Sequence, residues 1–167
     1  MAVLPILTYP NQLLKEKAKR VNEINNGIKK IAKDLKDTMF ASPGSVGVAA
    51  PQVGILKRII CIDVSKHKKA NSNHGLLILI NPEILAKGGG VIVREGCMSV
   101  PDYTANIKRA SWVLLDAVDL KGKQIIIESI GFEAVVLQHE IDHLNGILFL
   151  DRIASLTTDL FRRKNYK

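Results

Sequence analysis

Two histidines and a glutamate stand at the spacing of a metal site. Residues 139–143 read H-E-I-D-H, so His139 and His143 are four positions apart. On a helix such residues share one face, where both imidazoles can reach one metal ion and Glu140 can hydrogen-bond a metal-bound water. Two imidazoles buried without a metal would need other polar partners. The pattern therefore predicts a metal-dependent hydrolase rather than a pair of structural histidines.

A third protein ligand is needed, because a catalytic metal site typically takes three and keeps a further position for water. Cys97 is the candidate, since it follows a predicted strand, precedes a turn expected at Pro101, and adjoins Gly96, where the backbone can approach a ligand. The alternative is a small buried hydrophobe, a common fate of a free cysteine. Cys61 lies inside the apolar stretch 58–63 and is predicted to be such a packing residue.

Residues 46–54 form a run of mostly small residues before a predicted strand. Glycines such as Gly47 would let the backbone pass close to a bound peptide, and the Gln52 amide could donate a hydrogen bond to a developing oxyanion. A tight packing corner would have the same composition, so this segment alone leaves both interpretations open.

The elements that must position these residues follow from the apolar spacing. Apolar residues within 28–39 repeat at helical intervals and the pattern stops at Pro43, which predicts an amphipathic helix. A second helix is predicted between Gly131 and Asn145, with both histidines on its inward face. A tight turn at 120–122 favours antiparallel pairing. The predicted strands, short and β-branched, are 58–64, 76–80, 91–95, 111–119 and 124–129.

Helix, strands and helix in this order predict an α+β fold, with antiparallel strands around a central metal-binding H-E-x-x-H helix. A length of 167 residues suits one domain, and no repeat or linker divides the sequence. We therefore expect a single catalytic domain over residues 1–167. Its basic tail, about 155–167, is weakly periodic and is expected to fray.

Composition and charge narrow the class of protein. Hydrophobic residues make up 47% and charged residues 24%, which argues against disorder. Without a signal peptide or a membrane-length apolar run, a soluble cytoplasmic protein with no membrane partner is expected. The net charge of +8 would attract polyanions such as RNA, but aromatic residues total only 5%, so several solvated basic faces are favoured over a base-stacking site.

Three segments resemble the signature motifs of the peptide deformylase family, in the family's order and at compatible spacing. They are Gly47-Val-Ala-Ala-Pro-Gln52, Glu95-Gly-Cys-Met-Ser99 and Gln138-His-Glu-Ile-Asp-His143. Residues 4–7 and 147–152 resemble the family as well, so the likeness covers nearly the whole chain.

The resemblance implies hydrolysis of the N-formyl group from the formyl-methionine of nascent peptides, with release of formate. Cys97, His139 and His143 would hold one divalent metal, and the metal-bound water would attack the formyl carbon. Glu140 would be the general base and would then return the proton to the departing amine. The donor set accepts zinc, iron, nickel or cobalt; the resemblance suggests Fe²⁺ in the cell, with zinc less active. An iron-bound Cys97 would be prone to oxidation.

The same resemblance implies how the substrate is held. Gln52 and the backbone N–H of Met98 would stabilise the oxyanion. The Val46 backbone would pair with the peptide as an added strand, and Arg109 stands where many relatives carry a substrate-facing or structural arginine. Apart from the resemblance, the basic surface leaves a ribosome or rRNA contact open as a further partner. The substrate-binding candidates are Val46, Gly47, Gly96 and Arg109.

The chain departs from the family at three positions. Ser45 stands where the first motif usually has glycine, so its side chain would narrow the substrate channel or add a hydrogen bond. Met98 replaces the usual leucine, which a backbone interaction tolerates. Thr104 stands where some bacterial members have another arginine, which leaves peptide contacts beyond the first residue open.

Two rival interpretations remain. A small zinc endopeptidase would take histidine or glutamate downstream of the helix as third ligand, but only acids such as Asp151 and Asp159 follow, and no histidine. A catalytically idle RNA-binding or ribosome-associated module would explain the basic surface, yet it has no need of Glu140. Formate release from formyl-methionyl peptides separates an enzyme from such a module.

Overall fold

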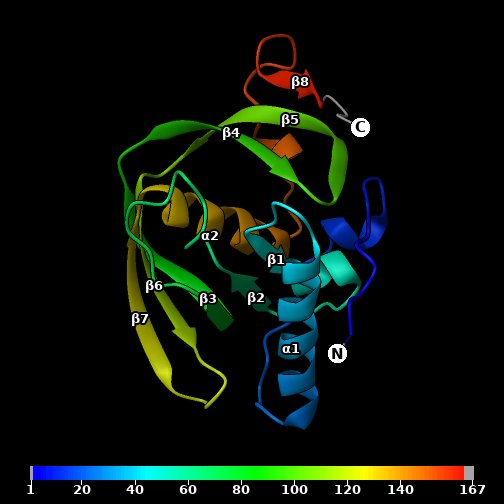
Figure 1. Ribbon diagram of the computed structural model, residues 1–167, viewed down its shortest axis with the longest axis vertical. Coiled ribbons are helices and arrows are strands. Elements are labelled where there is room, and N and C mark those ends of the chain that lie inside the picture. Colours follow the sequence, from blue (N-terminus) through cyan, green and yellow to red (C-terminus); the bar gives the residue numbers. More distant parts are fainter. Residues whose placement is uncertain (1, 164–167) are drawn as a thin grey trace.

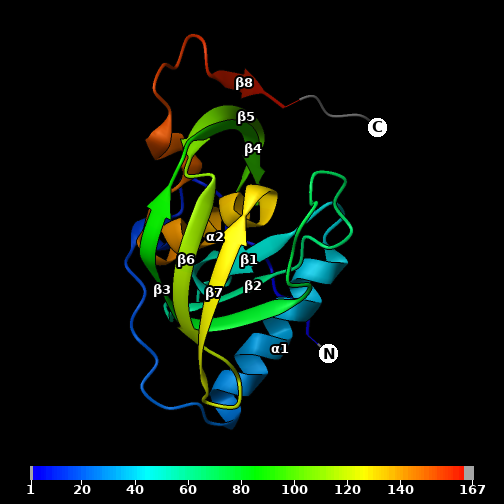
Figure 2. The same ribbon diagram turned by 90° about the vertical axis from the view of Figure 1, so that its left-hand side faces the viewer.

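Helix α2 (Gly131–Leu144) lies between two antiparallel sheets (Figures 1 and 2). The computed structural model describes residues 2–163. Because a sheet face and a helix must each bury their apolar sides, two sheets around one helix give this helix almost no free surface. The antiparallel α+β fold expected from the sequence is confirmed.

The larger sheet has five strands in the order β1-β2-β3-β6-β7, and every pair is antiparallel. The tight turn expected at 120–122 joins β6 to β7, where Gly122 has the positive φ that such a turn requires. Strand β1 is an edge strand and was not expected, because its three residues are too few to show alternation. The strands are β1 (Gly47–Ala49), β2 (Ile59–Ile62), β3 (Leu77–Gly88), β6 (Trp112–Val118) and β7 (Gln124–Ile130).

The smaller sheet contains β4 (Val91–Cys97), β5 (Val100–Arg109) and β8 (Leu160–Arg162), in the order β4-β5-β8. The turn expected at Pro101 is wrong, because Pro101 is the second residue of β5 and the chain turns at residues 98–99. A proline is tolerated at the start of a strand, where a missing N–H costs no central ladder bond.

The C-terminal segment is also more ordered than expected. Strand β8 pairs with β5 through Tyr103 and Arg162, and Leu160 packs against a small apolar cluster. Such long-range pairing is invisible to local periodicity, so the expectation that the tail frays is wrong as far as Arg163. The part of that expectation that falls on 164–167 lies outside the described residues.

Helix α1 (Asn26–Ala41) confirms the first predicted helix. The Asn25 side chain caps it by accepting from the Ile28 N–H at 3.0 Å. Its buried stripe packs against β1 and β2. Three short 3-10 helices complete the fold: η1 (Gln12–Lys15), η2 (Ala50–Val53) and η3 (Phe149–Arg152).

Helix α2 differs from an ordinary amphipathic helix. The sequence predicted one inward face, whereas the structure buries residues on nearly every side, including Glu133, Gln138, Glu140 and Asp142. The two flanking sheets leave no wide solvent face, so each buried polar side chain must find a partner or serve the chemistry.

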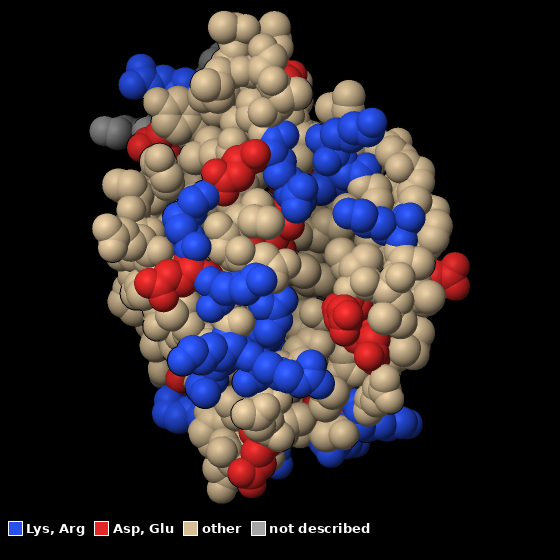
Figure 3. All heavy atoms as spheres, turned by 180° about the vertical axis from the view of Figure 1, so that it is seen from behind, with Lys and Arg blue, Asp and Glu red and all other residues tan. Residues whose placement is uncertain are grey.

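Figure 3 shows the molecule from behind, with lysine and arginine side chains in several groups and acidic side chains between them. On this face the positive charge is therefore divided rather than continuous. No helix among residues 2–163 is long and apolar enough to cross a membrane.

Candidate active site

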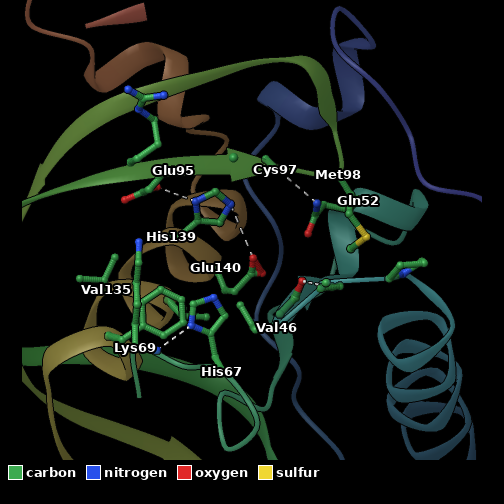
Figure 4. Close-up of a pocket in the computed structure, with 18 of the residues that line it drawn as sticks. Val46, Gln52, His67, Lys69, Glu95, Cys97, Met98, Val135, His139 and Glu140 are labelled. Atoms are coloured by element: carbon green, nitrogen blue, oxygen red, sulfur yellow. Dashed lines mark hydrogen bonds and ion pairs between the residues drawn. The ribbon is translucent and has the colours of Figure 1, made fainter. Parts of the chain in front are cut away.

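The structure brings the three predicted ligands together. Cys97 ends strand β4, and His139 and His143 lie on α2; one donor atom from each lies within 4.8 Å of the others. The Cys97 Sγ is 3.3 Å from Nε2 of His143. Figure 4 shows Cys97, His139 and Glu140 facing the same pocket. Residues 46 positions apart in the sequence thus form one donor cluster.

The chemistry of this cluster fits a metal. Burial raises the pKa of the Cys97 thiol, but the neighbouring His143 and His139 outweigh it and hold the pKa well below its usual value. A thiolate with two imidazoles suits zinc, iron, nickel or cobalt. Within residues 2–163, Nδ1 of His143 is buried without a hydrogen-bond partner. A purely structural histidine at position 143 would need a partner for this atom as well.

Glu95 orients His139. Its Oε1 lies 2.8 Å from Nδ1 of His139, which leaves Nε2 of that ring for the cluster. Arg109 donates to both Glu95 oxygens, at 2.7 and 2.8 Å. Burial raises the pKa of the Glu95 carboxyl, but hydrogen bonds from Arg109 and His139 lower it to about 2. With its pKa lowered, an ionised Glu95 carboxylate accepts from Nδ1 of His139 and so holds the ring in one orientation.

Arg109 corrects one sequence expectation. It is 5% exposed and does not line the site pocket. Its Nη1 donates to Asp142 at 2.6 Å, and Arg152 donates to the same carboxylate at 2.5 and 2.7 Å. Arg109 is therefore a structural arginine rather than a substrate contact. Spacing along β5 could not reveal which face of the strand it occupies.

Sequence reasoning did not predict this charged network, which joins Glu95, Arg109, Asp142 and Arg152. Two signals were available, because Glu95 opens the second motif and Asp142 lies within H-E-I-D-H. On a helix, however, Asp142 lies at the side of the histidine face, and only the structure shows which strand covers that side. The network reaches the donor cluster through Glu95, which accepts from Nδ1 of His139 and is itself held by Arg109.

Glu140 is 2% exposed, and its Oε1 is 3.7 Å from Nε2 of His139. Its Oε2 has no hydrogen-bond partner within residues 2–163. Burial raises the pKa of the carboxyl, and His139 and His143 oppose that effect only in part. Gly47 lies directly against it, since a Cβ at Gly47 would be 3.1 Å from Glu140 Cδ. Gly47 thus lets β1 approach this acid closely.

Gln52 is 1% exposed and held by η2 with its amide toward the cluster. Its Oε1 accepts from the Ala49 N–H at 2.9 Å, and its Nε2 donates to Ser99 Oγ at 3.1 Å and lies 3.5 Å from Cys97 Sγ. Segment 46–54 is therefore both a tight corner and a wall of the site. Ser99 is a contact that sequence reasoning missed.

A pocket of about 290 Å³ opens over these groups. Its inner end is polar, with Gln52, Cys97, His139 and Glu140 (Figure 4). Its side wall is apolar. Such a cavity suits a polar carbonyl group joined to an apolar side chain. The apolar wall consists of Val46, Met98, Phe132, Val135 and Val136, and the pocket also includes Gly47, Gly96, His67, Lys69, Arg94 and Arg163.

The remaining candidates also have defined places. Cys61 is fully buried in β2, and burial raises its pKa to about 12, which confirms the packing residue expected. Thr104 pairs with Phe161 of β8. Asp151 binds Lys15 and the Leu148 N–H, so it does not join the donor cluster. Asp159 accepts from the Ser155 N–H, so within residues 2–163 neither downstream acid joins the donor cluster as a zinc endopeptidase would require.

A buried thiol beside two imidazoles, next to a carboxylate whose Oε2 has no hydrogen-bond partner among residues 2–163, is the arrangement of a metal-dependent hydrolase site. Comparison of sequences agrees with this class. The model of the polypeptide deformylase family matches residues 3–159. A peptide deformylase from Thermodesulfovibrio yellowstonii is 45% identical over 164 residues, covering 98% of this chain and 97% of that protein. One from Syntrophobacter fumaroxidans is 43% identical, covering 98% and 94%.

Solved structures show the same fold. Peptide deformylase from Ehrlichia chaffeensis in complex with actinonin superposes with a TM-score of 0.87 at 36% identity, covering 94% of this chain and 92% of that one. Class I type b peptide deformylase from Acinetobacter baumannii with bound Met-Ala-Ser gives 0.84 at 34% identity, covering 91% and 99%. The chain belongs to the peptide deformylase family. It is a hydrolase that removes the N-formyl group from nascent peptides in a metal-dependent reaction.

Proposed function

We propose that Cys97, His139 and His143 hold the metal of this deformylase, which makes α2 the metal-binding H-E-x-x-H helix of the fold. Their proximity and the thiolate character of Cys97 support this assignment. When bound, a metal supplies Lewis-acid chemistry, polarising a carbonyl oxygen and lowering the pKa of water toward neutrality. The network behind the helix keeps His139 in the orientation that ligation needs.

Glu140 is the proposed general base. It accepts a proton from the attacking water at a carboxylate oxygen and passes it to the amine nitrogen as the formyl C–N bond breaks. Its buried and unpartnered Oε2, beside His139 and Gly47, supports this role. A structural carboxylate in the same position would need donors for both oxygens. An idle binding module has no use for an acid held in this way.

Gln52 Nε2 and the backbone N–H of Met98 are the proposed oxyanion donors. Ala49 and Ser99 fix the position of the Gln52 amide. Its second Nε2 hydrogen, which now faces Cys97 Sγ, is the one that would turn to the formyl oxygen as charge develops there. One preorganised donor of this kind contributes about 2.7–4 kcal/mol of transition-state stabilisation.

The peptide backbone is proposed to extend β1 as an added strand. Strand β1 has β2 on one side only, and Val46 O already accepts from the Asp63 N–H at 2.9 Å on that side. Gly47 and Gly96 face the same pocket, so they border the path of the peptide. The apolar wall beside Val135 would receive the methionine side chain. Arg109 has no part in this arrangement.

The metal used in the cell, the location of the protein and a ribosome contact are not decided by membership of the family. We expect Fe²⁺ as the metal in the cell, with Zn²⁺, Ni²⁺ or Co²⁺ as substitutes, because the donor set accepts each of them. The cytoplasm stays the predicted location, and a ribosome contact through basic surface stays a prediction. One catalytic domain over residues 1–167 is likewise proposed.

One observation carries this proposal: Cys97 and His139 of the donor cluster line the same pocket as Glu140 and Gln52. Formate release from formyl-Met-Ala-Ser by nickel-loaded protein tests it, with acetyl-Met-Ala-Ser as the control for selectivity toward the formyl group. We expect one formate and one free amine for each peptide consumed. No turnover by protein with a full metal complement would overturn the proposal.

A further inference from the structure

Three lysine and arginine side chains line the active-site pocket. Lys69 comes from the segment between β2 and β3, Arg94 from β4, and Arg163 from the residue after β8. Within residues 2–163, none of the three forms an ion pair with a carboxylate. Three parts of the chain far apart in sequence thus place unneutralised positive charge on one rim.

The acidic residues of the same pocket do not cancel this charge. Glu95 is bound by Arg109 and His139 on its far side, and Glu140 is buried at the inner end. A carboxylate on a peptide that leaves the pocket would therefore meet cations that have no other partner. Charge lining a cleft of this kind attracts the opposite charge and repels its own sign.

Arg94 and Arg163 are held in place rather than free in solvent. The Arg94 guanidinium lies over the Phe161 ring, 3.6 Å from its centroid, and its Nε donates to Asn106 at 3.2 Å. The Arg163 N–H donates to the Asp102 carbonyl at 2.8 Å. Its guanidinium lies against the backbone of Gly96, where a Cβ would collide with Nη2. Arg163 therefore borders Gly96, which lines the proposed peptide path, and Arg94 stands two residues before Gly96 on β4.

Lys69 is held by contacts of its own loop with the first turn of α2. The His67 ring stacks on Phe132, with centroids 4.2 Å apart, and the Lys69 N–H donates to His67 Nδ1 at 3.1 Å. Further along, both the N–H and Nδ1 of His74 lie 2.6 Å from the buried Glu133 carboxylate. Figure 4 shows Lys69 directed into the pocket from this loop.

We propose that Lys69, Arg94 and Arg163 form a specificity-determining rim that recognises an acidic side chain at the second or third residue of formyl-methionyl peptides. The inference rests on the proposed function, because it requires the formyl group to enter the polar end of the pocket. The peptide then passes between β1 and Gly96, and its next side chains reach the rim. Lysine or arginine at those positions is disfavoured by the same charges.

Amidated peptides that differ in one residue test this rim. The series is formyl-Met-Ala-Asp, formyl-Met-Ala-Asn and formyl-Met-Ala-Lys, each as the C-terminal amide so that no terminal carboxylate competes. At low salt we expect kcat/KM for the aspartate peptide to exceed that for asparagine by about three- to fivefold, with lysine lower by a similar factor. Raising the salt to about 1 M should compress both ratios toward one.

Variants assign the effect to the rim. Arg163→Gln should lower the aspartate-to-asparagine ratio, and Lys69→Gln combined with Arg94→Gln and Arg163→Gln should abolish it. Arg162→Gln is the matched control, because this neighbouring arginine is exposed and does not line the pocket. Equal kcat/KM for the three peptides, or an unchanged ratio in the triple variant, would overturn the inference. No turnover of any formylated peptide would instead refute the proposed function.

Discussion

The two sheets that enclose α2 each contribute one cysteine, and the two thiols behave in opposite ways. Cys61 of β2 lies among apolar neighbours, and burial raises its pKa to about 12. Cys97 of β4 is nearly as buried, yet His143 and His139 hold its pKa well below the ordinary value. Burial by itself therefore does not decide the state of a cysteine here; the groups that face it do.

The same contrast extends to the whole environment of the helix. Toward the five-stranded sheet, α2 packs residues such as Leu137 and Ile141 into the largest apolar cluster. On its other side lie Glu95, Arg109 and Asp142, joined by ion pairs. Apolar packing fixes where the helix lies, whereas hydrogen bonds fix how His139 is oriented, because only they depend on direction.

Replacing each cysteine with alanine gives the largest expected contrast. Cys97→Ala should lose the bound metal and, with it, formate release, since two imidazoles make an incomplete site. Cys61→Ala should keep both, because its thiol packs in β2 away from the donor cluster. Metal analysis beside the deformylation assay distinguishes the two variants. Full metal content in Cys97→Ala would contradict the ligand assignment.

Glu140→Ala separates metal binding from chemistry. We expect the metal to be retained, while kcat falls by about 10²- to 10⁴-fold, the usual range for a general base. Formate release is measured per metal-loaded site, so that partial occupancy cannot imitate a slow enzyme. An active Glu140→Ala protein would refute the assignment of this residue as the base.

One substitution on each side of α2 tests the division between packing and orientation. Glu95→Gln should weaken metal affinity by about 10- to 100-fold, because His139 loses its ionised partner. Leu137→Ala should cost about 2–5 kcal/mol in the free energy of unfolding, because it leaves a cavity in the apolar cluster. Metal titration and urea unfolding measure the two quantities.

The folded fraction of Leu137→Ala should bind metal with ordinary affinity. Glu128→Gln is the control for charge removal, since Glu128 is an exposed residue of β7. If Leu137→Ala weakened metal affinity as strongly as Glu95→Gln, packing and orientation would not be separable in this helix.

The raised pKa of Cys61 predicts a smaller effect at alkaline pH. Above the ordinary thiol pKa of 9.0 the unfolded chain loses a proton that the folded chain keeps until about pH 12. Stability therefore falls as pH rises through this window, by about 1.4 kcal/mol per pH unit at most. Urea unfolding at pH 8 and pH 10 should show this loss in the native protein and a smaller one in Cys61→Ala. Equal losses in both proteins would exclude the thiol as its source.

Ser45→Gly should have the smallest effect. The Ser45 hydroxyl donates to the Gly47 carbonyl at 3.3 Å, on the strand proposed to pair with the peptide. Without this hydroxyl the carbonyl is free for the substrate, so KM should fall by about two- to threefold while kcat changes little. Ser45→Ala removes the hydroxyl but keeps the Cβ, and steady-state kinetics of both variants separate the hydrogen bond from the channel width. A KM unchanged in both would show that Ser45 does not influence binding.

The sequence by itself determined the parts of this protein that depend on local spacing. The four-residue spacing of His139 and His143 places both rings on one helix face. Short β-branched stretches predicted β2, β4, β6, β7 and the first part of β3, but not β5. The motifs also singled out Cys97 and Gln52, which the fold brings to the same pocket. These features depend on neighbours a few residues away, or on a resemblance that spans the chain.

Only the tertiary structure decided the features that depend on distant segments. Strand β8 forms because β5 offers it an edge, and Arg109 is structural because Glu95 and Asp142 face it across the sheet and helix. The basic rim likewise joins residues from three separate elements. Two similar thiols receive opposite pKa shifts for the same reason. Which way a side chain points, and which groups surround it, depend on segments distant in sequence, so the spacing of residues along the chain does not reveal them.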